Sequence, residues 1–335
     1  MIVLAVAKRL ATTAVTLAGV AVVVFVLLRV VPGDPVAMMI SPGASLSDIS
    51  ALRAHYGLDG SLAMQFAIWL RALLHGDLGV SISMHRDVLG VLLERLPATL
   101  ELCLAAFAVA IAASGFVAVT GTIWRNSWVE EVIDTVNGLL LAIPDFVWAL
   151  ALVLLLGVLW PVLPLTGRID PSAGSGMKTP FFLTESLLRL RFDAFADTAR
   201  HLVMPVLALG LPLSAVIVRV LKGALNEAMA QDYVLLARLK GMSQLRLVLQ
   251  EALGNAIGPT LALTGVQFTF LVGSTVITER IFAYPGIGNM AIDAVINRDL
   301  PLIQGLVLMF AVIFIAVNML VDLLQLVFNP RLRHG

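Results

Sequence analysis

Carboxyl groups inside long apolar runs are the side chains of this sequence whose chemistry stands out. Asp145 follows Pro144 within one such run, and Glu101 lies near the start of another. A carboxylate is costly in hydrocarbon, so each is expected to face a neighbouring helix, a wet cavity or the membrane interface. For Asp145 two interpretations stay open: a hydrogen bond to backbone groups freed by Pro144, or a place on a transport pathway. For Glu101 we favour the wet interface.

Two uncharged polar residues share this setting. Gln267 and Asn318 lie within apolar runs in the second half of the chain. Together with Asp145 they form the predicted lining of a transport pathway. The alternative for both is a hydrogen bond between helices.

The groups that enzymes use are not gathered in a recognisable pattern. The five histidines are scattered without metal-ligand spacing, and the single cysteine, Cys103, excludes an intramolecular disulfide. Neither a Gly-x-x-x-x-Gly-Lys-Ser/Thr phosphate loop nor a Gly-x-Ser-x-Gly turn occurs. We therefore predict a non-catalytic chain with no metal and no cofactor of its own, so that any ATP hydrolysis must take place on another polypeptide.

The composition places these residues in a membrane. Apolar residues make up 59% of the chain and charged residues 13%, whereas a soluble domain has about 45–50% and about 25%. We predict an all-α integral membrane protein of the inner (plasma) membrane. The formal net charge of zero provides no overall field that would attract nucleic acid.

Six apolar runs are long enough to cross a bilayer, which takes about 20 residues. The predicted spans are residues 10–31, 98–124, 131–160, 200–219, 259–278 and 302–328. Lys8 and Arg9 favour a cytoplasmic N-terminus, and six spans return the C-terminus to the same side. Pro97 and Pro259 are predicted to begin spans, and Pro144 to kink or break the third.

The spans divide the chain into predicted parts. An exterior subdomain lies between the first two spans, and a cytoplasmic loop at 226–259 is the longest polar interruption of the second half. The parts are a tail and first span at 1–31, the exterior subdomain at 32–96, a core of five spans at 97–328 and a cytoplasmic tail at 329–335.

The loop at 226–259 has the pattern of helix, turn, helix. Gly241 is suited to ending the first helix in a left-handed conformation, and Ser243 stands where an N-cap would. An apolar stripe then recurs at helical spacing over residues 245–256. These features predict a short helical hairpin that offers a compact turn to the cytoplasm, which a partner protein can grip.

The run Asp232–Gly241 and the later Asn-Ala-Ile-Gly-Pro at 255–259 resemble the cytoplasmic "EAA" loop of bacterial ABC-importer permeases. The likeness is to the dipeptide/oligopeptide/nickel branch, although Leu235 and Leu236 replace the name-giving Glu and Ala. Six further runs resemble the same branch, in the same order: residues 32–35, 76–79, 96–102, 200–205, 279–289 and 329–333.

This resemblance implies a type I ABC-importer permease fold and the import of short peptides. The implied partners are a second, similar permease, two ATPase subunits that bind ATP and Mg, an exterior solute-binding protein and membrane lipid. The residues predicted to contact the ATPase are Tyr233, Ala237, Arg238 and Gly241.

The resemblance also covers the run after the fifth span, which combines glycines, a proline and aromatic residues. A turn of this kind can dip back into the helix bundle. Pro285, Gly286 and Gly288 are the predicted exterior gate.

Other functions stay open at this point. Nickel, glutathione or another small peptide-like solute is an alternative cargo for the same machinery. A stand-alone secondary transporter would place ion-coupling residues at broken helices, and Asp145 beside Pro144 is the one hint of this. An intramembrane enzyme is disfavoured because no nucleophile and base are paired.

Overall fold

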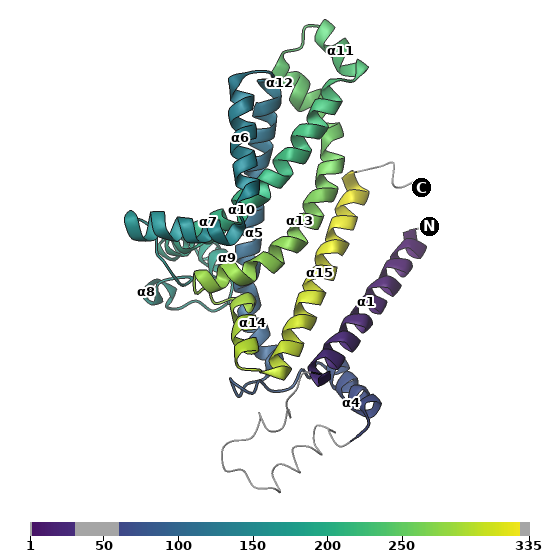
Figure 1. Cartoon of the computed structure of the whole chain (residues 1–335), viewed down its shortest axis with the longest axis vertical. Helices are drawn as coiled ribbons and strands as arrows, with labels where there is room; N and C mark the ends of the chain where they lie inside the picture. The colour runs from purple at the N-terminus through teal and green to yellow at the C-terminus, as the bar shows by residue number, and fades with distance from the viewer. Residues whose placement is uncertain (1, 31–59, 329–335) are drawn as a thin grey trace. The chain divides into compact units, whose positions relative to one another are not determined.

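The computed structural model describes residues 2–30 and 60–328 (Figure 1). Regular structure in this part is helical, apart from an isolated bridge between Val80 and Asp87. The predicted cytoplasmic tail at 329–335 and the first half of the predicted exterior subdomain lie outside the described residues.

The helices of the first half are α1 (Ile2–Val30), α4 (Leu62–Leu74), α5 (Val88–Ile123), α6 (Trp128–Ala142), α7 (Asp145–Leu152) with a π-helical extension (Val153–Leu159), and α8 (Pro171–Gly174). Those of the second half are α9 (Phe182–Leu188), α10 (Phe192–Met229), α11 (Asp232–Leu239), α12 (Gln244–Arg246) with a π-helical extension (Leu247–Ala252), α13 (Leu253–Ile281), α14 (Ile287–Ile296) and α15 (Leu300–Phe328).

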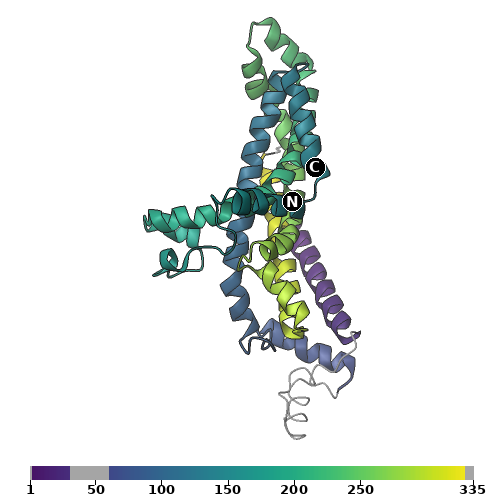
Figure 2. The same ribbon diagram turned by 60° about the vertical axis from the view of Figure 1, so that its left-hand side comes forward.

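Four of these helical stretches are long and apolar enough to cross a membrane. They are α5, α10, the continuous helix Gln244–Ile281, and the part of α15 up to Val321. A fifth candidate is the pair α6 and α7, which is bent by 99° (Figure 2). The all-α membrane fold with four to five apolar spans is therefore confirmed, and the count of six stays a prediction.

Two predicted helix starts are wrong. Pro97 and Pro259 lie inside α5 and α13, which begin earlier, at Val88 and Leu253. One proline removes a single backbone hydrogen bond, and membrane helices tolerate this because neighbouring groups satisfy the freed carbonyl. The extra turns of α5 are held by packing, since Val88 and Leu92 are fully buried.

The chain divides into two compact units. The larger comprises residues 97–289 and 316–335, and α10 is its centre, in contact with α13, α7, α9 and α6. The most apolar window of α10 is 67% buried, against 39% for the helix Gln244–Ile281. The other helices of this unit therefore pack around α10 and leave their outer faces exposed.

The smaller unit comprises residues 1–96 and 290–315. Phe25 of α1 lies 5.2 Å from Phe66 of α4, ring centre to ring centre, in an edge-to-face contact. Asp299, just before α15, accepts hydrogen bonds from Ser81 Oγ at 2.6 Å and from the N–H of Ser83 at 2.9 Å. Burial alone would raise the pKa of Asp299, but these hydrogen bonds outweigh it and the pKa is lowered.

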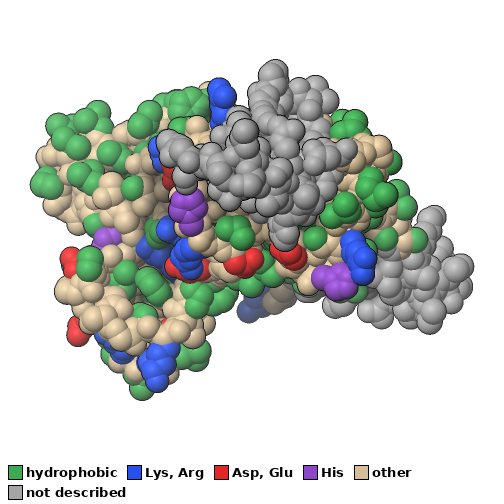
Figure 3. Space-filling view, turned by 90° about the horizontal axis from the view of Figure 1, so that it is seen from below, with side chains coloured by type: hydrophobic (Ala, Val, Ile, Leu, Met, Phe, Trp, Pro, Cys, Tyr) green, Lys and Arg blue, Asp and Glu red, His purple; other side chains and the backbone are tan. Residues whose placement is uncertain are grey.

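Much of the exposed surface is apolar. Hydrophobic side chains predominate over charged ones on the face shown in Figure 3. On α6, α7 and the π-helical extension of α7, four apolar side chains are each more than half exposed: Val132, Leu139, Leu150 and Leu154. Such faces suit helices that are surrounded by lipid.

Candidate functional site

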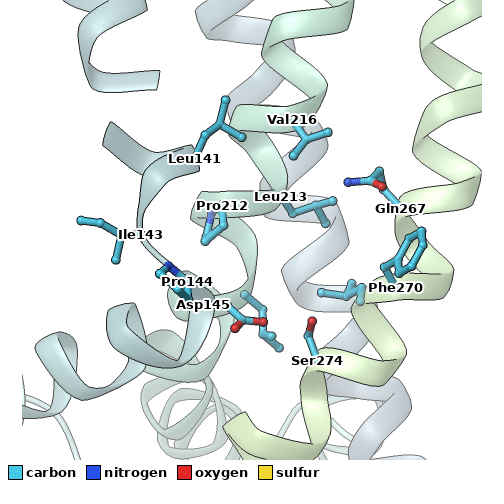
Figure 4. Close-up of a pocket in the computed structure, with 12 residues that line it drawn as sticks. Leu141, Ile143, Pro144, Asp145, Pro212, Leu213, Val216, Gln267, Phe270 and Ser274 are labelled. Carbon is cyan, nitrogen blue, oxygen red and sulfur yellow. The ribbon is translucent and has the colours of Figure 1, made fainter. Parts of the chain in front are cut away.

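A cavity lies at the break between α6 and α7, where α10 and α13 form its other walls (Figure 4). It encloses about 240 Å³, and most of its lining is apolar. The polar side chains in the lining are Asp145, Gln267 and Ser274. The remaining lining residues are Leu141, Ile143, Pro144, Leu209, Pro212, Leu213, Val216, Phe270 and Leu271.

The break is a local consequence of Pro144. Ile143 and Pro144 both have extended backbones, with ψ of 122° and 151°. A residue before proline is pushed out of the helical region, and proline cannot donate the next helical hydrogen bond. The predicted break is thus confirmed, and it makes Asp145 the first residue of α7, with its side chain directed into the cavity (Figure 4).

The Asp145 carboxylate has one hydrogen bond in the described structure, from the N–H of Phe146 to Oδ1 at 2.8 Å. That contact lies within its own helix. A hydrogen bond from Asp145 to backbone groups freed by Pro144, the first of the two interpretations above, is therefore not among its described contacts, and its second oxygen has no described partner.

Gln267 and Ser274 approach the same cavity from α13. They are seven residues apart, which is close to two helical turns, so they lie on one face. Gln267 is also the middle residue of α13. Neither side chain forms a hydrogen bond to another described residue. In Figure 4, Ser274 lies at the end of the cavity near Asp145, and Gln267 lies at the end near Val216.

The structure therefore brings two of the three predicted pathway residues together. Asp145 and Gln267 line one cavity, whereas Asn318 lies on α15 and is not among the lining residues. Ser274 was missed as a site residue. Its signal in the sequence is the spacing of seven from Gln267, which a search for polar residues on a shared helix face would have found.

The predicted hairpin is present as α11, a turn and α12 (Figure 1). Gly241 ends the first helix with φ of +82°, the left-handed conformation predicted for it. Ser243 occupies the N-cap position but its side chain caps no N–H. The Oη of Tyr233 accepts a hydrogen bond from Asn255 Nδ2 at 2.7 Å, which ties α11 to α13.

The hairpin is seated on a hydrophobic cluster, which we call the seat. It is built by α5, α10, the π-helical extension of α12 and the first turn of α13, with α11 packed on it. Its members are Ala118, Leu221, Leu225, Ala228, Met229, Val234, Ala237, Leu247, Val248, Ala252 and Ala256.

The four predicted ATPase contacts fall on two faces of this hairpin. Tyr233, Arg238 and Gly241 are exposed. Ala237 is 7% exposed and belongs to the seat, so it holds α11 in place and is not available to a partner.

Of the predicted gate residues, Pro285 and Gly286 lie in the turn between α13 and α14, and Gly288 is the second residue of α14. Gly286 and Gly288 are both buried, and a Cβ on Gly288 would lie 2.7 Å from the Cα of Val276. Glu279 closes this turn, since it accepts a hydrogen bond from Thr99 Oγ1 at 2.6 Å and from the N–H of Asn289 at 2.9 Å. Sequence reasoning missed Glu279, because nothing local shows that its carboxylate turns inward.

The structure also corrects the prediction made for Glu101. It is 5% exposed, so the wet-interface interpretation is wrong. Arg168, from the loop before α8, donates to Glu101 at 2.6 Å, and the N–H of Leu183 donates at 3.0 Å. The guanidinium also lies 4.2 Å from the centre of the Phe182 ring. The partner that makes burial possible is 67 residues away in the sequence, out of reach of a local pattern.

Among the described residues, no group of three or more His, Cys, Asp or Glu side chains could hold a metal ion. Metal and cofactor content therefore stays a prediction.

Apolar helices long enough to cross a membrane, a cavity between four of the helices and a hairpin packed on the seat define a multi-span membrane protein. The match to known families is specific. The family described as "Binding-protein-dependent transport system inner membrane component" matches residues 97–334, and the N-terminal family of the same components matches residues 1–103.

Individual relatives cover nearly the whole chain. It is 37% identical over 330 residues to the "Di/tripeptide transport system permease protein DppB" of Pseudomonas aeruginosa, covering 98% of both chains. It is 35% identical over 334 residues to the "Dipeptide transport system permease protein DppB" of Escherichia coli K12, again covering 98% of both. In fold alone it is similar to a chain of the inward-facing MetNI methionine ABC transporter, with a TM-score of 0.55 at 12% identity, over 71% of this chain and 96% of that one.

The chain belongs to the family of binding-protein-dependent transport system inner membrane components. It is the permease component of an ABC importer, which confirms the resemblance drawn from the loop motifs and sets aside the stand-alone secondary transporter. Such permeases are non-catalytic membrane subunits that work with an ATPase and a binding protein.

Proposed function

We propose that this chain forms half of the translocation pathway of an ATP-driven importer of short peptides, and that its hairpin is the part that a separate ATPase subunit moves. The observation that carries the proposal is the two-sided hairpin. One face of α11 is fixed to the bundle through the seat, and the other is open.

The open face is apolar at its centre. Leu235 and Leu236 are 53% and 55% exposed, and Leu239 is 78% exposed. Three large apolar side chains on one eight-residue helix are more than a solvated turn needs, and such patches mark interaction sites. Tyr233 and Arg238 add polar groups to the same exposed face.

The seat and the cavity are joined by two continuous helices. α10 carries Leu225 in the seat and Leu213 in the cavity, and α13 carries Ala256 in the seat and Gln267 in the cavity. Ala256 and Gln267 are about 16 Å apart along the helix axis, at about 1.5 Å per residue. A push on α11 would therefore reach the cavity through rigid helices, as rigid-body alternating access requires.

The ATPase drives the conformational change of the permease because it prefers one geometry of the hairpins that it holds. An ATPase dimer that closes on ATP favours one separation of the two hairpins it holds, and this shifts the permease between inward-open and outward-open states. In this scheme ATP and Mg are bound only by the ATPase subunits.

Short peptides are the proposed cargo because the relatives that cover this chain carry that cargo in their names. The cavity is compatible with it, since a mainly apolar lining with few polar groups can accept varied side chains. Nickel and glutathione are the alternative cargoes.

The proposed assembly contains a second, similar permease, two ATPase subunits, an exterior binding protein and surrounding lipid. We place six spans in this chain, both termini in the cytoplasm, and an exterior subdomain at 32–96. Pro285, Gly286 and Gly288, where the chain turns into α14, are the proposed exterior gate.

The test is a charge on the open face of the hairpin. Leu236→Glu should abolish co-purification of the ATPase subunit and lower ATP-dependent dipeptide uptake at least about tenfold, because a carboxylate would be buried against the partner. Leu188→Glu is the matched control, since Leu188 is 78% exposed on α9. This helix lies between the third and fourth predicted spans, which the six-span topology puts on the exterior side. Retention of both the ATPase and uptake by Leu236→Glu would contradict the docking assignment.

A further inference from the structure

The cavity contains one ionisable side chain. Of the twelve residues that line it, Asp145 alone can carry a charge. No described Lys, Arg or His forms an ion pair with it. Two acids of the preceding helix differ from Asp145 in this respect: Glu130 and Asp134 on α6 both contact Lys222 Nζ, at 2.8 and 2.7 Å.

A lone carboxylate within a membrane span is expensive unless water or a counter-charge reaches it. Here the N–H of Phe146 satisfies one oxygen, and the cavity is open to the other (Figure 4). Asp145 is the first residue of α7, so the structural role of its carboxylate is a favourable interaction with the helix dipole, which a Glu would keep and a neutral Asn would lose. That role does not require the side chain to face a cavity shared with two more unpaired polar groups.

Those groups complete the arrangement. Ser274 and Gln267 offer a hydroxyl and an amide on the α13 side, opposite the carboxylate from α7, and apolar side chains form the rest of the wall (Figure 4). A protonated amine flanked by a peptide group matches this set, because the carboxylate can bind the amine while the hydroxyl and amide bond to the neighbouring N–H and C=O groups.

We propose that Asp145 makes this cavity a subsite for a protonated amine of the cargo, with Gln267 and Ser274 binding the polar atoms next to it. The identity of the cargo in this proposal rests on the proposed function. The charge of the subsite can be measured without transport. The amine has two possible sources, the amino terminus of a peptide or a basic side chain, which the transport experiment separates.

The charge is measured by cysteine labelling in the purified importer complex. The single native cysteine, Cys103, is fully buried, so Ser274→Cys reports on the cavity. We compare its rates of reaction with cationic aminoethyl and anionic sulfonatoethyl methanethiosulfonate, with and without Asp145→Asn. The cation-to-anion ratio should fall about tenfold when the carboxylate is removed. Leu188→Cys is the control, and its ratio should not respond to Asp145→Asn.

Transport then tests selectivity. With saturating binding protein, we measure initial uptake of Gly-Ala and Lys-Ala by the wild type, Asp145→Asn and Asp145→Glu. Loss of one charge-assisted hydrogen bond should lower uptake about tenfold, with recovery in the Glu variant. A loss for both peptides assigns the subsite to the amino terminus, and a loss for Lys-Ala alone assigns it to a basic side chain.

Two results would overturn the subsite: an unchanged labelling ratio at Ser274→Cys, or uptake of both peptides that Asp145→Asn leaves unchanged. An equal loss in the Asn and Glu variants would also overturn it, because it would show that the loss does not depend on the charge. If the wild type imports neither peptide while the labelling ratio still falls, the proposed cargo fails and the cationic subsite stands.

Discussion

Buried charges in this chain are held by partners that come from distant segments, and this makes them sensitive to single substitutions. Arg168 and Glu101 are each about 5% exposed at the side chain and lie 2.6 Å apart. Removing one partner leaves the other charge buried and unpaired, which costs about 3–5 kcal/mol in comparable pairs.

Glu101→Gln is therefore expected to lower the thermal unfolding midpoint of the purified protein, measured by tryptophan fluorescence in detergent. The double variant Glu101→Leu with Arg168→Met should recover most of the loss, because it removes both charges and keeps apolar volume. A double variant as unstable as the single one would show that the pair itself is not the source of the effect.

Glu185 on α9 is a second buried carboxylate, and its contribution to stability should depend on pH. Its pKa is lowered from 4.5 to about 2, first because Thr179 Oγ1 donates a hydrogen bond and then because the N–H groups of Lys178 and Thr179 do. A folded pKa below the unfolded one contributes stability that is complete well above pH 4.5 and is lost as the pH falls from there toward 2.

We expect proteolysis of residues 175–190, a segment that includes α9, to increase as the pH is lowered from 6 to 3, measured with an acid-tolerant protease. Glu185→Gln should be cleaved readily already at pH 6 and should respond less to acid. Asp193→Asn, which alters an exposed carboxyl on α10, is the control and should behave like the wild type. An unchanged acid response in Glu185→Gln would refute this assignment.

At the scale of elements, local rules predicted some features of this fold and missed others. Pro144 breaks its helix and Gly241 ends one, because both effects depend only on the residue and its neighbours. Pro97 and Pro259 misled the same rules, since tertiary packing extends α5 and α13 past them. Asp145 and Gln267 were each predicted as pathway residues from the sequence. Only the fold shows that they line the same cavity.

Adjacent residues of α11 allow two effects to be tested separately: the packing of α11 on the seat and the docking of the ATPase subunit. Val234 is fully buried in the seat, whereas Leu235 is 53% exposed. Val234→Asp should release α11, so that limited trypsin cleaves at Arg238 and the ATPase subunit is lost. Leu235→Asp should lose the ATPase subunit while the hairpin stays resistant. Equal protease sensitivity in the two variants would show that α11 is not held by its buried face.

At the scale of the whole molecule, the proposed mechanism needs the hairpin and the α8–α9 loop on opposite sides of the membrane. ATP is available only in the cytosol, so a hairpin that docks on an ATPase must face it. The α8–α9 loop lies between the third and fourth predicted spans, one crossing away from the hairpin. If both termini are cytoplasmic, the number of spans must be even, and the predicted six spans meet this condition.

Cysteine labelling in intact cells tests this arrangement directly. Ser172→Cys in α8 should react with a membrane-impermeant maleimide added outside, whereas Leu239→Cys in α11 should react only after the membrane is permeabilised. Cys103 is fully buried and gives the unlabelled background, and His75→Cys should behave like Ser172→Cys if α1 crosses the bilayer. Labelling of Leu239→Cys from outside would put the hairpin out of reach of any cytosolic ATPase and would end the mechanism proposed for it.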